Sequence, residues 1–406
     1  MKNLLGGIRI VDVTTILFGP MASQILADLG AEVIKVESPE GDLARHSGSL
    51  GPDGTGAVFA NNNRNKRSLA LDLRRPEGRA VLERLLAGAD VFLHNMRPQA
   101  AARLGLSCEA VRKANPKIVY CAGVGFGSGG PYAGRPAYDD VVQAASSLAA
   151  LPLAVGREAD YVPSVMADKI GALHVAYAIL AALLHRERSG ESASIEVPMF
   201  EALTAFLLNE HLDAASFAAD GRPGYNRLLN PNRRPYRTAD GWLAVLPYSQ
   251  AQWRKTLAEI GQAALMEEPW FATAAGRNAQ AERLYGLLAE ALPARGTEDW
   301  VAVFERLDVP YARLNSLDDL LADPHLEAVG FFEPTDDLPG RVRSVPQPVG
   351  FEGVAEAADR GAPALGADGP AILAELGYDA AEIAALQAAG VILGPAAAAE
   401  RRQASS

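Results

Sequence analysis

The chain begins with Ile8-Arg-Ile-Val-Asp-Val13, then Met21-Ala-Ser-Gln-Ile-Leu-Ala-Asp-Leu29-Gly30, then Glu32-Val-Ile-Lys-Val-Glu37. The first and third segments are short and rich in Val and Ile, as is typical of buried strands, and the second has the length and closing glycine of a helix. A strand, a helix and a second strand in this order form a βαβ unit, whose two strands are parallel. This stretch therefore predicts an α/β fold.

The same alternation continues along the next ninety residues. Strands are predicted at residues 68–73, 90–94 and 117–122, and a helix from Pro76, a favourable first helical residue, through Leu86. Strands that alternate with helices predict a doubly wound parallel sheet with its ligand beyond the carboxyl ends of the strands. We expect four loops to meet there: residues 16–20, 38–45, 95–98 and 123–136.

Composition narrows the function classes. The 406 residues are 49% hydrophobic and 21% charged, which fits a globular protein, and the net charge of −11 argues against nucleic acid as a partner. Two cysteines, Cys108 and Cys121, provide neither a disulfide framework nor metal-ligand spacing, and they fit packing roles in a reducing cytoplasm. The first strand follows the N-terminus without a signal region, and the apolar run 170–184 is shorter than a membrane span. We expect a cytoplasmic protein without a metal or a membrane partner.

One carboxylate stands at the start of that apolar run. Asp168 precedes a predicted helix that ends in His185-Arg-Glu-Arg-Ser-Gly190, with cations and a glycine suited to a helix C-terminus. In the first helical turn the free N–H groups and the helix dipole favour the ionised form of a carboxylate, as a nucleophile requires. An N-cap role for Asp168 is the alternative. The run Gly125-Phe-Gly-Ser-Gly-Gly130 has the spacing of a dinucleotide motif, but Pro131-Tyr132 follows where that motif must open a helix.

Three ordered segments resemble the class III CoA-transferases: Tyr138-Asp-Asp-Val-Val-Gln143, Met166-Ala-Asp-Lys-Ile-Gly-Ala-Leu-His174 and Ser192-Ala-Ser-Ile-Glu-Val-Pro-Met-Phe-Glu-Ala-Leu203. That family contains formyl-CoA and carnitine CoA-transferases and α-methylacyl-CoA racemases. The likeness extends from Gly7 to Tyr378. It implies CoA transfer from an acyl-CoA donor to a small carboxylic acid through aspartyl anhydride and aspartyl-CoA thioester intermediates. It also implies a coenzyme A thioester as substrate, no tightly bound cofactor, and an interlocked homodimer.

The resemblance also implies a division of the chain. A large CoA-binding domain would comprise residues 1–212, and the chain would return to this domain at residues 326–392. A linker at 213–235 would lead into a smaller α/β domain at 236–325. Residues 393–406 are low in complexity and are expected to form a flexible tail.

The resemblance assigns the site residues. Asp168 would be the nucleophile, and Asp139 would either help to position the acceptor or the thiol, or be structural. The CoA-contacting positions would be Phe18, Leu71, Arg74, Asn95, Met96, Arg97, Arg103, Ala137 and Tyr138. Ser38 stands where the family has a basic residue, and Arg45 is a candidate to replace it. His94 replaces a common glutamate, and a structural role is expected for it.

Three alternatives remain open. The racemase branch needs two acid/base groups and has a His-Asp pair where this chain has Tyr138-Asp139, and a phenol with a usual pKa of about 10 is a poor base near neutrality. Transfer is therefore favoured over an α-methylacyl-CoA racemase or isomerase. A non-catalytic CoA-binding protein is a more remote alternative, because Asp168 is present, and an NAD-dependent oxidoreductase is more remote still.

Overall fold

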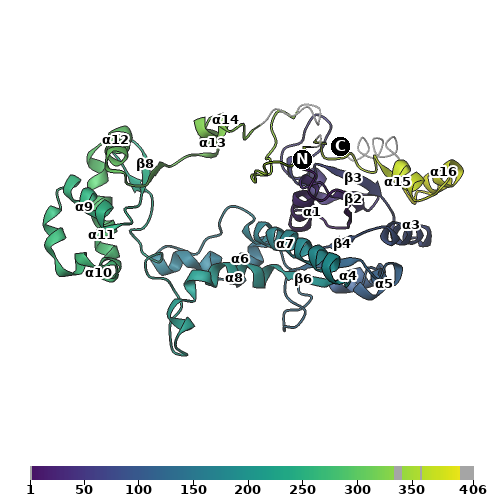
Figure 1. Ribbon diagram of the computed structural model, residues 1–406, viewed down its shortest axis with the longest axis horizontal. Helices are drawn as coiled ribbons and strands as arrows, with labels where there is room; N and C mark the ends of the chain where they lie inside the picture. Colours follow the sequence, from purple (N-terminus) through teal and green to yellow (C-terminus); the bar gives the residue numbers. More distant parts are fainter. Residues whose placement is uncertain (1, 333–340, 357–358, 394–406) are drawn as a thin grey trace. The chain divides into compact units, whose positions relative to one another are not determined.

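A six-stranded sheet forms the centre of the first half of the chain in the computed structural model (Figure 1). Its order is β3-β2-β1-β4-β5-β6, and every neighbouring pair is parallel. The order reverses between β1 and β4, and such a switch point opens a crevice for a ligand at the carboxyl ends of the strands. The strands are β1 Arg9–Asp12, β2 Glu32–Glu37, β3 Lys66–Ala70, β4 Val91–His94, β5 Val119–Val124 and β6 Ser194–Pro198.

Helices connect and cover these strands, as a parallel sheet requires. C-terminal residues also pack into the sheet's apolar core, where Ile372 and Ile392 lie against strand residues such as Val11 and Leu69. The helices are α1 Phe18–Asp28, η1 Leu43–His46, α2 Ala57–Asn62, α3 Pro76–Ala87, α4 Pro98–Arg103, α5 Cys108–Ala114, α6 Asp139–Ala145, α7 Met166–Ser189, α8 Met199–His211, α15 Gly369–Glu375 and α16 Ala380–Ala388.

Helix α7 extends beyond both ends of the apolar run 170–184, as predicted. Its 24 residues include Asp168 in the first turn and His185–Ser189 in the last, and Gly190 ends it in the left-handed conformation with a φ of +76°. By length and composition alone it could cross a membrane, but half of its most apolar window is buried inside the protein. It packs on α1, β5 and β6. Core helices of globular proteins pass the same test of length and composition.

A second group of elements forms its own core. A three-stranded antiparallel sheet has the order β7-β8-β9, with β7 Tyr236–Arg237, β8 Trp242–Val245 and β9 Tyr311–Arg313. Large side chains such as Trp253, Phe271, Tyr285, Trp300 and Phe304 fill the space beside it. The helical segments are η2 Leu148–Val155, η3 Asp213–Ser216, α9 Gln250–Glu259, η4 Ala263–Glu267, η5 Pro269–Ala272, α10 Ala274–Ala279, α11 Ala281–Ala291, η6 Leu292–Ala294, α12 Thr297–Leu307, α13 Leu317–Leu321 and α14 Pro324–Ala328.

The structure describes residues 2–332, 341–356 and 359–393, and the chain divides into two compact units. Unit 1 comprises Met1–Ser146, Tyr161–Phe206 and Gly330–Ser406, and contains the parallel sheet. Unit 2 comprises Ser147–Asp160 and Leu207–Val329, and contains the antiparallel sheet. Apart from Leu393, the tail predicted at 393–406 lies outside the described residues.

The predicted parallel α/β architecture is confirmed, with strand ends shifted by one to three residues, and the early start of β3 has a physical cause. Strand β3 begins at Lys66, two residues before the predicted start. The Lys66 side chain is fully buried, and its ammonium lies 3.2 Å from Asp12 Oδ2 and 2.8 Å from Asn63 Oδ1. A buried lysine cannot be recognised from an apolar pattern, because its burial depends on partners elsewhere in the chain.

Beneath the carboxyl ends of β1–β3 lie six buried charges that we call the ion cluster: Asp12, Lys35, Glu37, Asp42, Arg45 and Lys66. Lys35 Nζ lies 3.0 Å from Asp42 Oδ2, and Arg45 forms two bonds to Glu37 of 2.7 and 2.8 Å. Burial disfavours the ionised form of Asp12, but the ammonium groups of Lys66 and Lys35 outweigh it and hold the Asp12 pKa at about 2. Burial lowers the pKa of Lys66 to about 8, although Asp12 opposes the shift.

Candidate active site

A cavity of about 390 Å³ opens at the carboxyl ends of the parallel strands in unit 1. It is lined by the four loops that were expected to converge, so that prediction is confirmed. Seven of the residues predicted from the sequence line it, namely Phe18, Asn95, Met96, Arg97, Ala137, Tyr138 and Asp168. The lining residues that sequence reasoning did not single out are Thr15, Ile16, Gly41, Leu43, Pro98, Gly123, Val124, Gly125, Phe126, Gly134, Arg135, Pro136 and Met199.

Asp168 is the third residue of α7, and Val165, not Asp168, occupies the N-cap position. Asp139, the first residue of α6, instead accepts the free backbone N–H groups at the start of α7. Its Oδ1 accepts the backbone N–H groups of Ala167 at 2.6 Å and Asp168 at 3.1 Å, and its Oδ2 accepts from Gln143 Nε2 at 2.6 Å. Asp139 is buried and is not among the residues that line the cavity. Asp139 therefore holds the backbone of Asp168 without entering the cavity.

The expectation that helix α7 favours an ionised Asp168 is wrong. Burial, and after it the negative charge of Asp139, raise the pKa of Asp168 to about 7. The two N–H groups that could have stabilised the Asp168 carboxylate already donate to Asp139. A carboxylate that lacks such donors is destabilised by partial burial, and therefore more reactive once it has lost its proton.

Phe18, the first residue of α1, forms one wall beside this carboxylate. A Cβ added to Gly123 would lie 2.6 Å from the Phe18 ring, and a Cβ added to Gly171 would also lie 2.6 Å from it. Both glycines therefore keep space for the ring, one from the end of β5 and one from α7. Their absence of a side chain fixes the position of Phe18 in the cavity wall.

The loop after β1 is held in an unusual conformation. Ile16 has a φ of +71°, which costs a β-branched residue of the order of 1–3 kcal/mol. Its N–H donates to Asp42 Oδ1 at 3.0 Å, and the same carboxylate accepts from Lys35 Nζ and Ala44 N. The ion cluster thus holds a strained residue that lines the cavity.

A smaller cavity of about 260 Å³ shares Met96 with the first and contains the predicted residues Leu71 and Arg74. Arg74 forms an exposed pair with Asp72, with Nε 2.8 Å from Oδ1. Thr15 and Gly41 also line both cavities, so the two adjoin and a long substrate could extend across both. Arg103 is exposed at the end of α4 and lines neither cavity.

Most of the basic residues near these strands already have acidic partners. Arg64 pairs with Asp28, Arg67 with Glu32 and Glu375, and Arg45 with Glu37. The suggestion that Arg45 replaces the missing cation at Ser38 is therefore wrong, because Arg45 is buried in the ion cluster.

Two exposed arginines that line the cavity differ from these. Within the part of the chain that the structure describes, neither Arg97 nor Arg135 forms an ion pair, and Arg135 stacks on Tyr132 at 4.3 Å. Arg135 lies near the end of the glycine-rich loop 125–136, and only its position in that loop could have drawn attention to it in the sequence. Both guanidinium groups are available to an anionic substrate.

His94 has the expected structural role. Burial lowers its pKa to about 4, so the ring is neutral at physiological pH. Its Nδ1 accepts the N–H of Met96 at 3.2 Å, and its Nε2 lies 2.6 Å from the Tyr120 hydroxyl, which donates to Leu106 O. The imidazole thereby fixes the backbone at Met96.

The glycine-rich loop is not a dinucleotide motif in the structure. Residues 125–136 form turns between β5 and α6 and open no helix. The loop is fastened by two carboxylates of the segment that follows α7: Glu196 Oε1 accepts Ser128 N at 2.9 Å, and Glu201 Oε1 accepts Gly127 N at 3.0 Å. Gly125 and Gly134 of this loop line the cavity close to Tyr138.

Comparison with known proteins gives this geometry a context. The model of CoA-transferase family III matches residues 5–369. The chain belongs to CoA-transferase family III. It is 34% identical to a succinate–glutarate CoA-transferase of Agrobacterium fabrum, over 92% of this chain and 96% of the relative. It is 28% identical to a formyl-CoA:oxalate CoA-transferase of Escherichia coli O6:H1, over 95% of this chain and 99% of that protein.

A solved structure of a CAIB/BAIF family protein from Brucella suis is similar to this family III chain. The TM-score is 0.78 at 32% identity, and the match covers 93% of this chain and all of that one. The family acts on acyl-CoA and carboxylate substrates, so the chain is an acyl-CoA:carboxylate CoA-transferase. The two remote alternatives, a non-catalytic CoA-binding protein and an NAD-dependent oxidoreductase, are set aside.

Proposed function

We propose that Asp168 carries the CoA group during transfer. One observation supports this more than any other: Asp168 is the single carboxylate among the described residues that line the cavity, and no second acidic or imidazole group stands there. A racemase needs two acid/base groups around the substrate α-carbon. Covalent transfer needs one nucleophile, and this is what the lining residues offer.

The proposed reaction has four steps. The Asp168 carboxylate attacks the donor thioester carbonyl, which forms a mixed anhydride and releases the CoA thiolate. The thiolate attacks the Asp168 carbonyl, which forms the aspartyl-CoA thioester and releases the donor acid. The acceptor carboxylate attacks this thioester, which forms a second anhydride and releases the thiolate again. The thiolate finally attacks the acceptor carbonyl, which forms the new acyl-CoA and restores Asp168.

The other site residues would bind and orient the substrates. We propose that Phe18, Asn95, Met96, Ala137 and Tyr138 contact CoA in the larger cavity, and that Leu71 extends the contact into the smaller one. Arg97, with Arg74 beside Leu71, would supply positive charge for the phosphates of CoA. Backbone N–H groups of the glycine-rich loop are suited to stabilise the oxyanions that form at each attack.

The test is a trapping experiment with several acyl-CoA donors. Succinyl-CoA comes first, because a relative is named for succinate and glutarate. After hydroxylamine treatment, mass spectrometry should locate the modified residue at Asp168, and Asp168→Asn should show no modification. Asp140→Asn is the matched control, since Asp140 is an exposed carboxylate of α6. Absence of any adduct together with exchange of the substrate α-proton in deuterated water would refute the covalent mechanism and favour the racemase-like role, in which Asp168 carries a proton.

We also propose an interlocked homodimer, located in the cytoplasm. Unit 1 exposes large apolar side chains on α7, where Leu173 is 53% and Tyr177 58% exposed. Such a surface is typical of an interface. Light scattering should give twice the chain mass, and Leu173→Glu with Tyr177→Glu should reduce it, whereas Leu4→Glu should not. Interlocking predicts that tagged and untagged dimers exchange chains only after unfolding.

A further inference from the structure

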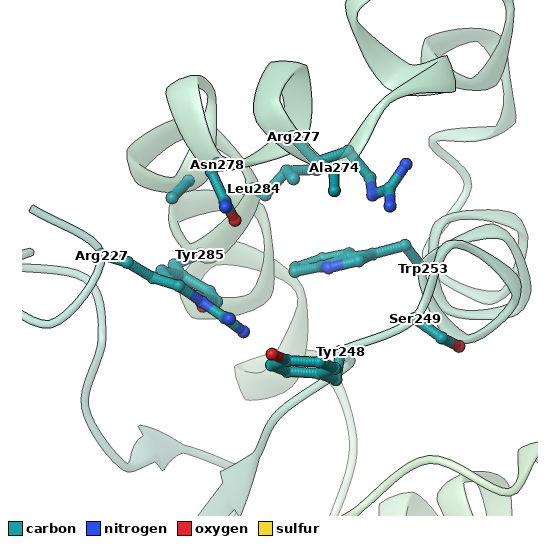
Figure 2. Close-up of a pocket in the computed structure, with 10 residues that line it drawn as sticks. Arg227, Tyr248, Ser249, Trp253, Ala274, Arg277, Asn278, Leu284 and Tyr285 are labelled. Carbon is teal, nitrogen blue, oxygen red and sulfur yellow. The ribbon is translucent and has the colours of Figure 1, made fainter.

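Unit 2 contains a cavity of its own, of about 260 Å³ (Figure 2). All of its walls come from the loop before β7 and from the segment 248–285, so it is complete within this unit. The lining residues are Arg227, Tyr248, Ser249, Trp253, Ala274, Arg277, Asn278, Ala281, Leu284 and Tyr285. Neither the family assignment nor the proposed reaction gives this cavity a role.

Its charge differs from that of the chain as a whole. In a protein with a net charge of −11, the described residues that line this cavity include two arginines and no acid. Within the described part of the chain, neither Arg227 nor Arg277 pairs with a carboxylate. The cavity is therefore a local positive site.

Arg227 is fixed in place by neutral groups. Its Nε donates to the Tyr285 hydroxyl at 3.1 Å, and its guanidinium lies 4.5 Å from the centre of the Tyr248 ring. Burial disfavours its charge, but the hydroxyl of Tyr285 and those of Tyr248 and Tyr225 outweigh burial and raise the pKa. Nε is used in the bond to Tyr285, and the hydroxyls of Tyr248 and Tyr225 each engage at most one of the four terminal N–H groups, so N–H groups remain for a ligand. Figure 2 shows the guanidinium directed toward the space between Tyr248 and Tyr285.

The other walls suit a flat ligand. The Trp253 ring projects into the cavity between Tyr248 and the helix that carries Arg277 and Asn278 (Figure 2). Arg277 is anchored through one N–H to Phe271 O at 2.8 Å. Aromatic faces bind planar groups by stacking, and Arg binds carboxylates through paired N–H bonds. Since a water molecule occupies about 30 Å³, the cavity of about 260 Å³ has room for a ligand of roughly nine non-hydrogen atoms, far smaller than CoA.

We propose that this cavity binds a small aromatic carboxylic acid. The carboxylate receives N–H bonds from Arg227, and the ring lies against Tyr248 and Trp253. Size excludes CoA itself, and the absence of acidic lining residues excludes a cationic ligand. The site is an accessory binding site for free acid in unit 2, and it does not depend on Asp168.

Titration calorimetry with benzoate tests this in the full-length protein. We expect saturable binding with a Kd of about 0.1–1 mM, a range reasonable for so few atoms. Benzamide, which lacks the charge, and cyclohexanecarboxylate, which lacks the flat ring, should each bind about tenfold more weakly.

Matched variants localise the site. Arg227→Gln should weaken benzoate binding at least about tenfold, whereas Arg222→Gln, an exposed arginine of the same loop, should leave it unchanged. Tyr248→Phe should retain binding, and Tyr248→Ala should weaken it, because the ring is the contact. Tyr248 is 68% exposed, so its truncation leaves the core intact.

Three outcomes would overturn the proposal. The first is no saturable binding up to about 10 mM benzoate. The second is equal binding of benzamide. The third is loss of binding in Arg97→Gln but not in Arg227→Gln, which would place the acid in the cavity of unit 1. The trapping experiment at Asp168 is independent of all three.

Discussion

Replacement of Asp168 by Asn should stabilise the protein while it abolishes transfer. Asn has the shape of Asp but carries no charge, so the variant avoids the cost of a carboxylate in this environment. The Asp168 pKa is about 7 in the folded protein, against a usual value of 3.8. A difference of about three pH units corresponds to about 4 kcal/mol, and partial exposure reduces this to about 2–4 kcal/mol.

The pH dependence identifies the cause. Between pH 4 and pH 7 the folded chain holds a proton on Asp168 that the unfolded chain has lost, so this group makes the wild type less stable as pH rises. The gain in Asp168→Asn should therefore be near zero at pH 4 and reach its full size at about pH 8.

Urea denaturation of both proteins at several pH values measures this difference, and effects of other titrating groups cancel in the comparison. Asp140→Asn, which removes an exposed carboxylate, should change stability by less than about 0.5 kcal/mol. If Asp168→Asn is no more stable than wild type at pH 8, or if its advantage grows toward pH 4, the assigned electrostatics of Asp168 are wrong.

Three further predictions concern activity. Transfer should increase with pH through about 7 as Asp168 loses its proton, and a rate that is flat from pH 5 to pH 9 would contradict this. Arg97→Gln should raise the KM for acyl-CoA about tenfold with little change in kcat, whereas Arg103→Gln, outside both cavities, should leave steady-state kinetics unaltered. Gly123→Ala should displace Phe18, lower the free energy of unfolding by about 1–3 kcal/mol in a thermal unfolding assay, and raise the KM for acyl-CoA. Phe18→Leu added to this variant should restore part of the stability and part of the KM. If it restores neither, the proposed contact between residue 123 and Phe18 is wrong.

The fold class was accessible from the sequence because it depends on local patterns. Runs such as Ile8–Val13 and Glu32–Glu37 are rich in Val and Ile, which indicates that they are buried strands. The loops that follow them lie at the same edge of the sheet because the strands are parallel. Lys66 shows the limit of this reasoning. It is fully buried in β3 because Asp12, 54 positions earlier, and Asn63, three positions earlier, contact its ammonium, and neither residue indicates a buried lysine by its type or its spacing.

Which residues gather at the cavity was better predicted than their electrostatics: seven of the predicted site residues line it, and Asp139 and Arg103 do not. The resemblance named Asp168 and Asp139, yet the relation between them depends on which N–H groups Asp139 accepts, 28 and 29 positions along the chain. The helix-dipole argument for Asp168 failed because it treated the first turn of α7 as free. Arg103 and Arg97 look equivalent in the sequence, and only the position of α4 separates them.

The ion cluster under the cavity has a consequence for how this sequence can diverge. Its six charges balance one another in the interior, and loss of one partner would leave a buried charge unpaired at a cost of about 3–5 kcal/mol. A single substitution would therefore remove much of the stability of an ordinary domain. A substitution at Asp12, Lys35 or Asp42 therefore requires a compensating substitution at another of these positions in the same lineage, and we expect the three to change together. The exposed arginines at the cavity mouth have no such partners among the described residues and remain free to change with the substrate.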